Sequence, residues 1–323
     1  MLESRALILA RVETTYGVDA HPTPAADAIR TTKPTIELIE ESRERDVVLP
    51  HFGSLANIPV ATGIKIAFGV EVRGSGVTPP STPPRIGALL RACGFTQTVT
   101  TTLGAERVDY DPHSAMDGES VTIYFHHDGI LYRALGCVGN SVKISAKTND
   151  IAKFDFEFTG MFGGIASFAS MTAFPAPVAG DAAVPLVFRS SSLSFGGFIG
   201  GNAIVDAIEI TRVNTIAKRT DANAPHGIRR YSFIGREISG SLDPEIIPLA
   251  VWSPWIIWEN AGLVALSMTI GAVAGNRFVI SMPRCQIDAP KLGAREGIQT
   301  YAISFKARTT LAAGNDEIQF RFN

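Results

Sequence analysis

The stretch GVEVRGS at residues 69–75 recurs as GREISGS at residues 235–241. Each copy carries a glycine, a glutamate, a β-branched residue and a Gly-Ser pair in the same order: Gly69/Gly235, Glu71/Glu237, Val72/Ile238, Gly74/Gly240 and Ser75/Ser241. A β-branched residue favours a strand, and a following Gly-Ser pair favours a turn. The two copies therefore predict the same strand-to-turn step, written twice in one chain.

The sequence around both copies predicts a duplicated domain. Each copy precedes a short helix pattern that starts after serine and proline and ends at glycine, in STPPRIGALLRACG (81–94) and SPWIIWENAG (253–262). The segment PAPVAGDAAVP (175–185) between them is rich in Pro, Ala and Gly and indicates a linker. We expect one domain over residues 1–174 and a second over residues 186–323.

Alternation of apolar and polar residues predicts that the chain is mainly β. FDFEFTG (154–160), YAISFKAR (301–308) and EIQFRF (317–322) each place large apolar side chains at every second position. VTIYFHHDGILYRALGCV (121–138) indicates a hairpin, with Asp128-Gly129 as its turn. The expected architecture is two tandem β-sandwich or half-barrel domains, each with a short flanking helix.

The amino-acid composition limits the classes of function that this chain can have. The chain has 323 residues, of which 46% are hydrophobic and 19% charged, enough to build two cores. The net charge of −2 gives no overall field for capturing nucleic acid. Three widely spaced cysteines argue against a disulfide framework or a zinc site. Charge-poor stretches at 158–180 and 246–275 are broken by Gly and Pro, so no membrane span is expected.

No residue pattern indicates an enzyme, a cofactor or a metal site. His126 and His127 follow each other on a predicted strand, so their side chains point to opposite faces and cannot share one ion. Glu71 and Glu237 occupy equivalent places in two domains, not one cleft. The sequence therefore predicts no catalytic, cofactor-binding or metal-binding residues.

Arg236 and three tryptophans allow more than one interpretation. Arg236 is predicted on an otherwise apolar strand face. Either its aliphatic stem covers the core while its guanidinium reaches the edge of the sheet, or this end of the strand lies at a contact between subunits. Trp252, Trp255 and Trp258 lie at helical spacing, which is typical of packing and could also form sugar platforms.

The chain resembles the tail tube proteins of bacteriophages with long, non-contractile tails. The resemblance is carried in the first half by LARVETTYGVDAHPTPAADAI (9–29), IELIEESRERD (36–46), HFGSL (51–55), FGVEVRGSG (68–76) and IGALLRACGF (86–95). NAIVDAIEI (202–210), GREISGS and AGNRFVISMP (274–283) resemble a second copy of the same domain.

The resemblance implies a structural virion protein that forms stacked rings of the siphovirus tail tube, through which genome DNA passes. Sheets from six domains of that family join edge to edge into an inner barrel. Because this chain carries two domains, the resemblance implies a homotrimer with pseudo-sixfold symmetry and a pseudo-hexameric ring. It further implies contact with the tape measure, tail terminator and distal tail proteins, a place in the virion tail, and synthesis in the host bacterial cytoplasm. DNA would pass transiently, without specific binding, and no membrane is involved.

One long segment is expected to reach another subunit or ring. EESRERDVVLPHFGSLANIPVATG (40–63) exceeds an ordinary hairpin loop, and loops of that length are usually functional. We expect it to act together with the N-terminal arm, residues 1–30. Its candidate contact residues are Arg45, Asp46, Leu49, His51, Phe52 and Leu55.

A conduit for DNA needs a lumen without basic stacking platforms, and acidic charge there would keep DNA from binding. The candidates for lumen-facing acidic residues are those on the polar sides of predicted strands: Glu71, Asp155, Glu157 and Glu237.

Two other functions remain open at this point. Another β-rich virion component, such as a tail terminator or decoration protein, would form discrete rings where a tube protein forms long tubes. A carbohydrate-active β-sandwich enzyme would need clustered carboxylates beside aromatic platforms.

Overall fold

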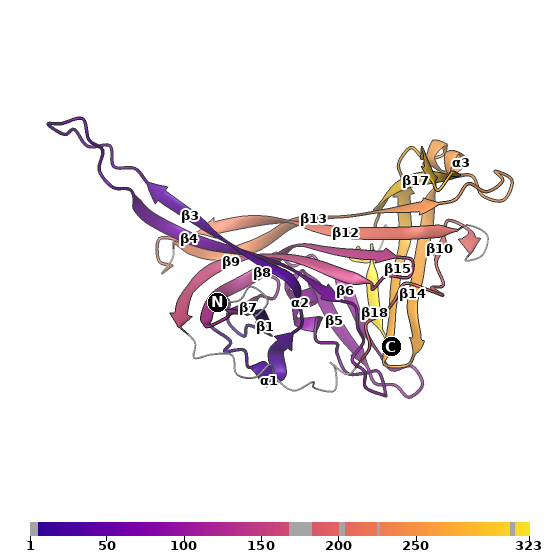
Figure 1. The fold of residues 1–323 in the computed structure, drawn as a ribbon, viewed down its shortest axis with the longest axis horizontal. Helices are drawn as coiled ribbons and strands as arrows, with labels where there is room; N and C mark the ends of the chain where they lie inside the picture. Colours follow the sequence, from indigo (N-terminus) through magenta and orange to yellow (C-terminus); the bar gives the residue numbers. More distant parts are fainter. Residues whose placement is uncertain (1–5, 168–182, 200–203, 225–226, 311–313) are drawn as a thin grey trace.

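The computed structural model describes residues 6–167, 183–199, 204–224, 227–310 and 314–323. Within these residues the protein has eighteen β-strands and three short α-helices, so the fold is mainly β, as the alternating patterns predict. A sheet of long strands runs across the molecule, other strands pack beneath it, and one hairpin extends far beyond the body (Figure 1).

The two halves of the chain share one order of elements. Each half contributes a long hairpin, which is followed by a short helix and a second hairpin. A third hairpin comes later in the half, and its last strand pairs with the second strand of the long hairpin. The elements of the first half are β1 (Ala6–Val12), α1 (Pro24–Asp27), β2 (Ala28–Ile29), β3 (Thr32–Arg43), β4 (Ile58–Glu71), α2 (Gly87–Ala92), β5 (Phe95–Thr100), β6 (Arg107–Pro112), β7 (Val121–His127), β8 (Ile130–Lys147) and β9 (Lys153–Ser167). Those of the second half are β10 (Ser194–Phe195), β11 (Phe198–Ile199), β12 (Val205–Thr220), β13 (Ile228–Pro244), α3 (Pro254–Glu259), β14 (Leu263–Val273), β15 (Asn276–Ile287), β16 (Lys291–Arg295), β17 (Ile298–Ala307) and β18 (Gln319–Phe322).

One continuous antiparallel sheet, which we call the spanning sheet, contains four strands from each half. Its order is β3-β4-β9-β8-β12-β13-β17-β16. The halves meet where residues 141–147 of β8 pair with residues 207–213 of β12. Ladder hydrogen bonds therefore join the two halves directly.

The buried face of the spanning sheet forms the core. Phe154, Phe156 and Phe158 on β9 are at most 2% exposed. The ring of Phe154 lies 5.5 Å from that of Phe278 on β15 and 5.9 Å from that of Phe320 on β18. Each such phenylalanine contributes about 1.5–3 kcal/mol by leaving water. The period-two pattern of FDFEFTG is thus confirmed, together with its physical cause.

A second layer of strands also contains pairs formed between the two halves of the chain. The C-terminal strand β18 pairs on one side with β15 and on the other with β6, where Phe320 lies opposite Tyr110. The buried side chains Ile318, Phe320 and Phe322 confirm the alternation expected of EIQFRF. Strand β17 likewise buries Tyr301, Ile303 and Phe305, as YAISFKAR predicts.

The predicted turns and helix ends are confirmed in part. Asp128 (φ 37°) and Gly129 (φ 98°) make the tight turn of the β7–β8 hairpin. Helix α3 starts at Pro254, and the backbone N–H of Ile256 donates to the Oγ of its cap, Ser253 (3.4 Å).

Helix α2 begins later than the sequence predicts. Its first residue is Gly87, so neither Ser81 nor Thr82 caps it, and the two prolines lie before the turn at 85–86 that leads into it. Gly94 ends it with a φ of 83°. Within the described residues, no helix has the length and apolar content to cross a membrane.

Two expected boundaries are corrected by the strand pairing. The long segment 40–63 is shortened to a loop at 44–57, because the β3–β4 ladder continues to the pair Arg43 and Ile58. Strand β1 pairs along its whole length with β7 and buries Leu7, Ile8, Leu9 and Ala10. Residues 6–12 of the expected N-terminal arm therefore belong to the protein's own core, and a contact of residues 13–30 with a neighbour stays a prediction. Most of the expected linker, and residues 1–5, lie outside the described residues.

Candidate functional site

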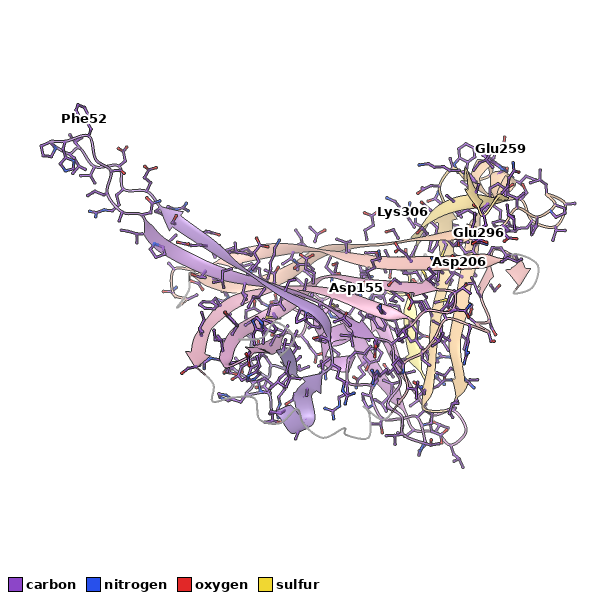
Figure 2. The ribbon with its side chains drawn as sticks, in the orientation of Figure 1. Phe52, Asp155, Asp206, Glu259, Glu296 and Lys306 are labelled. Atoms are coloured by element: carbon purple, nitrogen blue, oxygen red, sulfur yellow. The ribbon has the colours of Figure 1, made fainter. Side chains whose placement is uncertain are left out.

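The face of the spanning sheet opposite the core is polar, and it carries all four predicted acidic residues. Directly opposite residues of antiparallel strands point to the same face. Glu71 and Asp155 are linked through the β4–β9 register, and Glu157 follows Asp155 by two positions on β9. From Glu157, opposite pairs lead through Ser141 and Val213 to Glu237. Figure 2 labels Asp155 and Lys306 on this sheet.

Lysines interleave with these acids, so the polar face is mixed in charge. Lys153 lies opposite Glu71, and Lys143 lies opposite Asp155. The Nζ atom of Lys306 lies 2.5 Å from the Oε1 atom of Glu237, and this hydrogen bond lowers the pKa of that carboxyl group. The acidic residues of this face were predicted from the sequence, but the lysines that lie opposite them on neighbouring strands were not.

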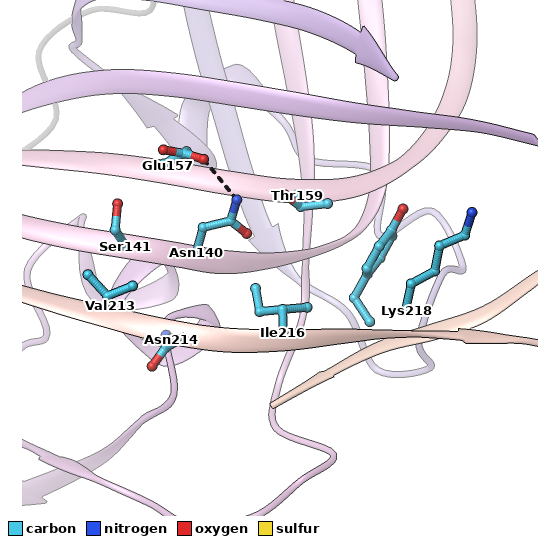
Figure 3. Close-up of a pocket in the computed structure, with 9 residues that line it drawn as sticks. Asn140, Ser141, Glu157, Thr159, Val213, Asn214, Ile216 and Lys218 are labelled. Carbon is cyan, nitrogen blue, oxygen red and sulfur yellow. Dashed lines mark hydrogen bonds between the residues drawn. The ribbon is translucent and has the colours of Figure 1, made fainter. Parts of the chain in front are cut away.

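A cavity of about 480 Å³ opens where β12 stops pairing with β8 (Figure 3). The amide Nδ2 of Asn140 donates to Glu157 Oε1 across its wall (2.9 Å). The Lys218 amine pairs with Glu41 of β3 and lowers the pKa of that carboxyl group. The lining residues are Asn140, Ser141, Glu157, Thr159, Val213, Asn214, Ile216, Lys218 and Tyr231. The carboxylate and the amine of this wall are therefore both engaged, and the cavity extends the polar face.

The spanning sheet ends in two strands that each have one paired side. Within the described residues, β3 pairs only with β4 and β16 pairs only with β17. The free side of β3 is twelve residues long, and that of β16 is five. Unpaired strand edges are templates for pairing with another chain.

The β3–β4 hairpin forms an extended arm with apolar residues near its tip. Phe52, which Figure 2 labels there, is fully exposed, and Val48 is 98% exposed. Of the predicted contact residues, Arg45, Asp46, His51 and Phe52 are exposed, and Leu49 and Leu55 are half-buried. Exposed large apolar residues gathered on a projection are typical of a protein contact.

A second apolar surface, the α3 patch, lies near the β16 edge. It consists of Trp255, Ile256, Trp258 and Leu292, which are 38%, 58%, 45% and 70% exposed. The Trp255 ring lies 6.4 Å from that of Tyr301, which is directly opposite Leu292. Trp252, by contrast, is buried and donates from Nε1 to the Gly196 carbonyl (3.1 Å). Only Trp252 has the purely internal packing role that its spacing suggested.

The two copies of the repeated motif lie in different settings. Gly69 and Glu71 end strand β4, and Gly74 and Ser75 follow it outside the strand. Gly235, Glu237, Gly240 and Ser241 all lie inside β13, which continues to Pro244.

The turn expected after the second copy is therefore wrong. Gly240 is paired on both sides, with Ile210 and Phe305, and a Cβ atom there would collide with the Phe305 ring. A different contact requires glycine at position 74, because a Cβ atom there would collide with the backbone of Gly275. Close approach, not turn geometry, selects both glycines.

Arg236 joins the two halves within one chain. Its Nη1 donates to the His113 carbonyl (2.8 Å), and its Nη2 donates to Asn315 Oδ1 (2.8 Å) and to both oxygens of Glu317 (2.8 and 3.0 Å). Arg236 of β13 thus bonds both to the loop after β6, in the first half, and to the segment before β18, in the second half. The arginine head is thus neither simply solvent-exposed at an edge nor free for a neighbour.

Sequence reasoning missed a buried arginine, Arg212 on β12. It is 3% exposed, and Ile208 and Ile210 share its face of the strand. Its Nη2 donates to the Gly94 carbonyl at the end of α2 (3.0 Å). The alternation of NAIVDAIEITRVN already points position 212 inward, so the signal was present in the sequence.

One comparison with known proteins bears on these surfaces. The family model described as phage tail tube protein matches residues 3–307, a single match that includes the arm, the α3 patch and the whole spanning sheet. No curated protein matches the chain.

Proposed function

The chain belongs to the phage tail tube protein family, and on that premise we propose that its copies form stacked rings that conduct genome DNA through the tail. The observation that carries the proposal is the spanning sheet. Its four strands from each half are joined by a β8–β12 ladder, and both of its outer edges are unpaired within the described residues.

The β8–β12 pairing within one chain suggests how the sheets of two chains would pair. By element order, β16 in the second half corresponds to β8 in the first, and β3 corresponds to β12. Strand directions alternate throughout the sheet, so β16 would meet β3 of the next copy in antiparallel orientation, as β8 meets β12. Such a contact is head-to-tail, and head-to-tail contacts close into rings when the rotation permits.

Two domains per chain favour a homotrimer. The two halves contribute equal numbers of strands, so three copies would supply six similar sheets to one pseudo-hexameric ring. The α3 patch lies beside the β16 edge, where the next copy would cover its tryptophans. The corresponding helix α2 is already buried in the chain, with Leu89 and Leu90 fully covered.

The polar face would line the lumen. Glu71, Asp155, Glu157 and Glu237 lie on it, and lysines of neighbouring strands lie opposite Glu71 and Asp155 or bond to Glu237, so acids would compensate the basic charge that passing phosphates meet there. The same face is free of exposed aromatic residues on β9 and β13, which would otherwise stack on bases. Transit without specific binding follows from both properties.

The arm would contact the next ring. Its tip carries Phe52 and Val48 in full exposure, a position that gains apolar burial only when another molecule covers it. The ends of such a tube would meet tape measure, tail terminator and distal tail proteins in the virion tail after synthesis in the host cytoplasm.

Electron microscopy of the purified protein tests the proposal. We expect long tubes whose rings have threefold symmetry and pseudo-sixfold appearance. Discrete rings that never elongate would favour a tail terminator or decoration protein. A stable monomer at high concentration would contradict the edge-to-edge joint.

The arm has a separate test with a matched control. Replacing residues 45–56 by Asn-Gly keeps the β3–β4 ladder and removes the tip. We expect rings that no longer stack. Shortening the β5–β6 loop around Leu103, which is also exposed, should leave stacking unchanged. Normal tubes from the arm variant would refute the inter-ring role.

A further inference from the structure

A second cavity, of about 650 Å³, lies on the opposite side of β12 and β13 from the polar face. The loop after β6 and the segment before β18 form its other walls. Its lining residues are His113, Ser114, Ala115, Met116, Arg212, Asn214, Phe233, Ile234, Gly235, Arg236, Thr309, Gly314, Asn315 and Glu317. Nothing in the proposed assembly uses this cavity.

Arg212 is one of the lining residues, and one nitrogen of its guanidinium is unpaired within the described part of the chain. Its Nε donates to Asn214 Oδ1 (2.9 Å), its Nη2 donates to the Gly94 carbonyl (3.0 Å), and its guanidinium carbon lies 4.3 Å from the centre of the Phe95 ring. Its Nη1 is buried and has no hydrogen-bond partner among the described residues. Leaving a buried charged donor unpaired is costly, so a missing acceptor is expected there.

The charges around Arg212 do not supply that acceptor. Glu317 is the one carboxylate of the lining, and Arg236 engages both of its oxygens. His113 accepts a hydrogen bond at Nδ1 from the backbone N–H of Ala115 (3.1 Å). Burial, together with Arg212 and Arg236, lowers the pKa of His113, so it is neutral at pH 7. The lining thus holds two arginines against one glutamate.

We propose that this cavity binds a small oxyanion, a phosphate or a carboxylate, on Nη1 of Arg212. A guanidinium presents planar N–H donors that suit both anions. Ser114 and Asn315 add polar side chains to the same lining. The bound anion would balance the charge between the loop after β6 and the segment before β18, and so strengthen the junction of the two halves.

The test measures the thermal unfolding of the full chain at pH 7.5 in phosphate, sulfate, acetate or chloride at one ionic strength. Binding to the folded state alone raises the melting temperature with the logarithm of anion concentration, and at a hundred times the dissociation constant it shifts the unfolding equilibrium about a hundredfold. We expect phosphate or acetate to raise the melting temperature relative to chloride. Which of the two acts at lower concentration identifies the anion class.

Two variants locate the effect. Arg212→Gln should abolish the anion-dependent increment, and Arg219→Gln should keep it, because Arg219 is a more exposed arginine on the same strand. Should Arg212→Gln fail to fold, Ile234→Glu serves instead. Ile234 is 62% exposed and lines the cavity, so a carboxylate there should shrink the increment without touching the contacts of Arg212.

Equal melting temperatures in all four salts would overturn the proposal. So would an increment that survives unchanged in Arg212→Gln or in Ile234→Glu, since the anion would then bind elsewhere. Broadening of the ³¹P resonance of phosphate by the wild type and by Arg219→Gln, and not by Arg212→Gln, is an independent readout of the same site.

Discussion

The Arg236–Glu317 pair, which links β13 to the segment before β18, permits a quantitative prediction about the stability of the chain. Arg236→Met removes the guanidinium and keeps most of the apolar stem. It leaves the Glu317 carboxylate, whose side chain is 11% exposed, without its cation. Breaking one side of a buried ion pair costs about 3–5 kcal/mol, and the partial exposure of both partners favours the lower value, about 3 kcal/mol.

This free energy can be converted into a melting temperature. Unfolding entropy is about 2.1 cal/mol/K per residue, so about 1 kcal/mol corresponds to about 1.5 °C for a chain of 323 residues. We therefore expect Arg236→Met to lower the melting temperature by about 4–5 °C. Calorimetry and denaturant unfolding measure the two quantities independently.

Two further variants separate the ion pair from general effects. Lys306→Met breaks the exposed ion pair between Lys306 and Glu237, whose side chains are 42% and 60% exposed, and should lower the melting temperature far less than Arg236→Met does. The double variant Arg236→Met/Glu317→Leu should regain much of the loss, because no unpaired charge remains. If Arg236→Met were no more destabilising than Lys306→Met, the stabilising role of the Arg236–Glu317 pair would be refuted.

Three other predictions concern the arm, the sheet and the pH dependence. Phe52→Ser should leave the melting temperature unchanged and reduce tube formation seen by microscopy, whereas Leu103→Ser, at a similarly exposed loop position, should change neither. Gly240→Ala should cost at least about 1–3 kcal/mol in denaturant unfolding, because its new methyl group collides with the Phe305 ring; wild-type stability would contradict that packing. The pKa of His113 is lower in the folded state, so stability is complete above about pH 6.5 and declines as the pH falls through the folded value. His113→Asn should flatten that part of the stability profile, and an unaltered profile would exclude His113 as its source.

Sequence reasoning recovered those parts of the fold that depend on local periodicity. FDFEFTG and YAISFKAR fix which side chains are buried, because a strand alternates its faces whatever surrounds it. The turn at Asp128-Gly129 is equally local, since the positive φ angles belong to those residues themselves. Family resemblance came from the order of several such segments, and the family match agrees with it.

The parts that could not be predicted depend on contacts between distant segments. The Gly-Ser pair of GREISGS suggested a turn, yet the partner that selects Gly240 is Phe305, which lies on another strand. The second cavity gathers residues from four separate stretches, near 113, 212, 235 and 315, and only the folded register brings them together. The lysines beside the predicted acids were visible in the sequence, but their pairing needed the cross-strand alignment.

The position of β18 between β6 and β15 also orders events during synthesis. Arg321 of β18 bonds to Asp109 of β6, a partner made 212 residues earlier. At about 5–20 residues per second, β6 waits roughly 10–40 s on the ribosome with one edge open. The nascent first half therefore cannot complete the pairing of β6 until the second half has emerged from the ribosome. In the proposed assembly, the subunit would become competent to join a ring only as a whole, which would protect a growing tube from half-made chains.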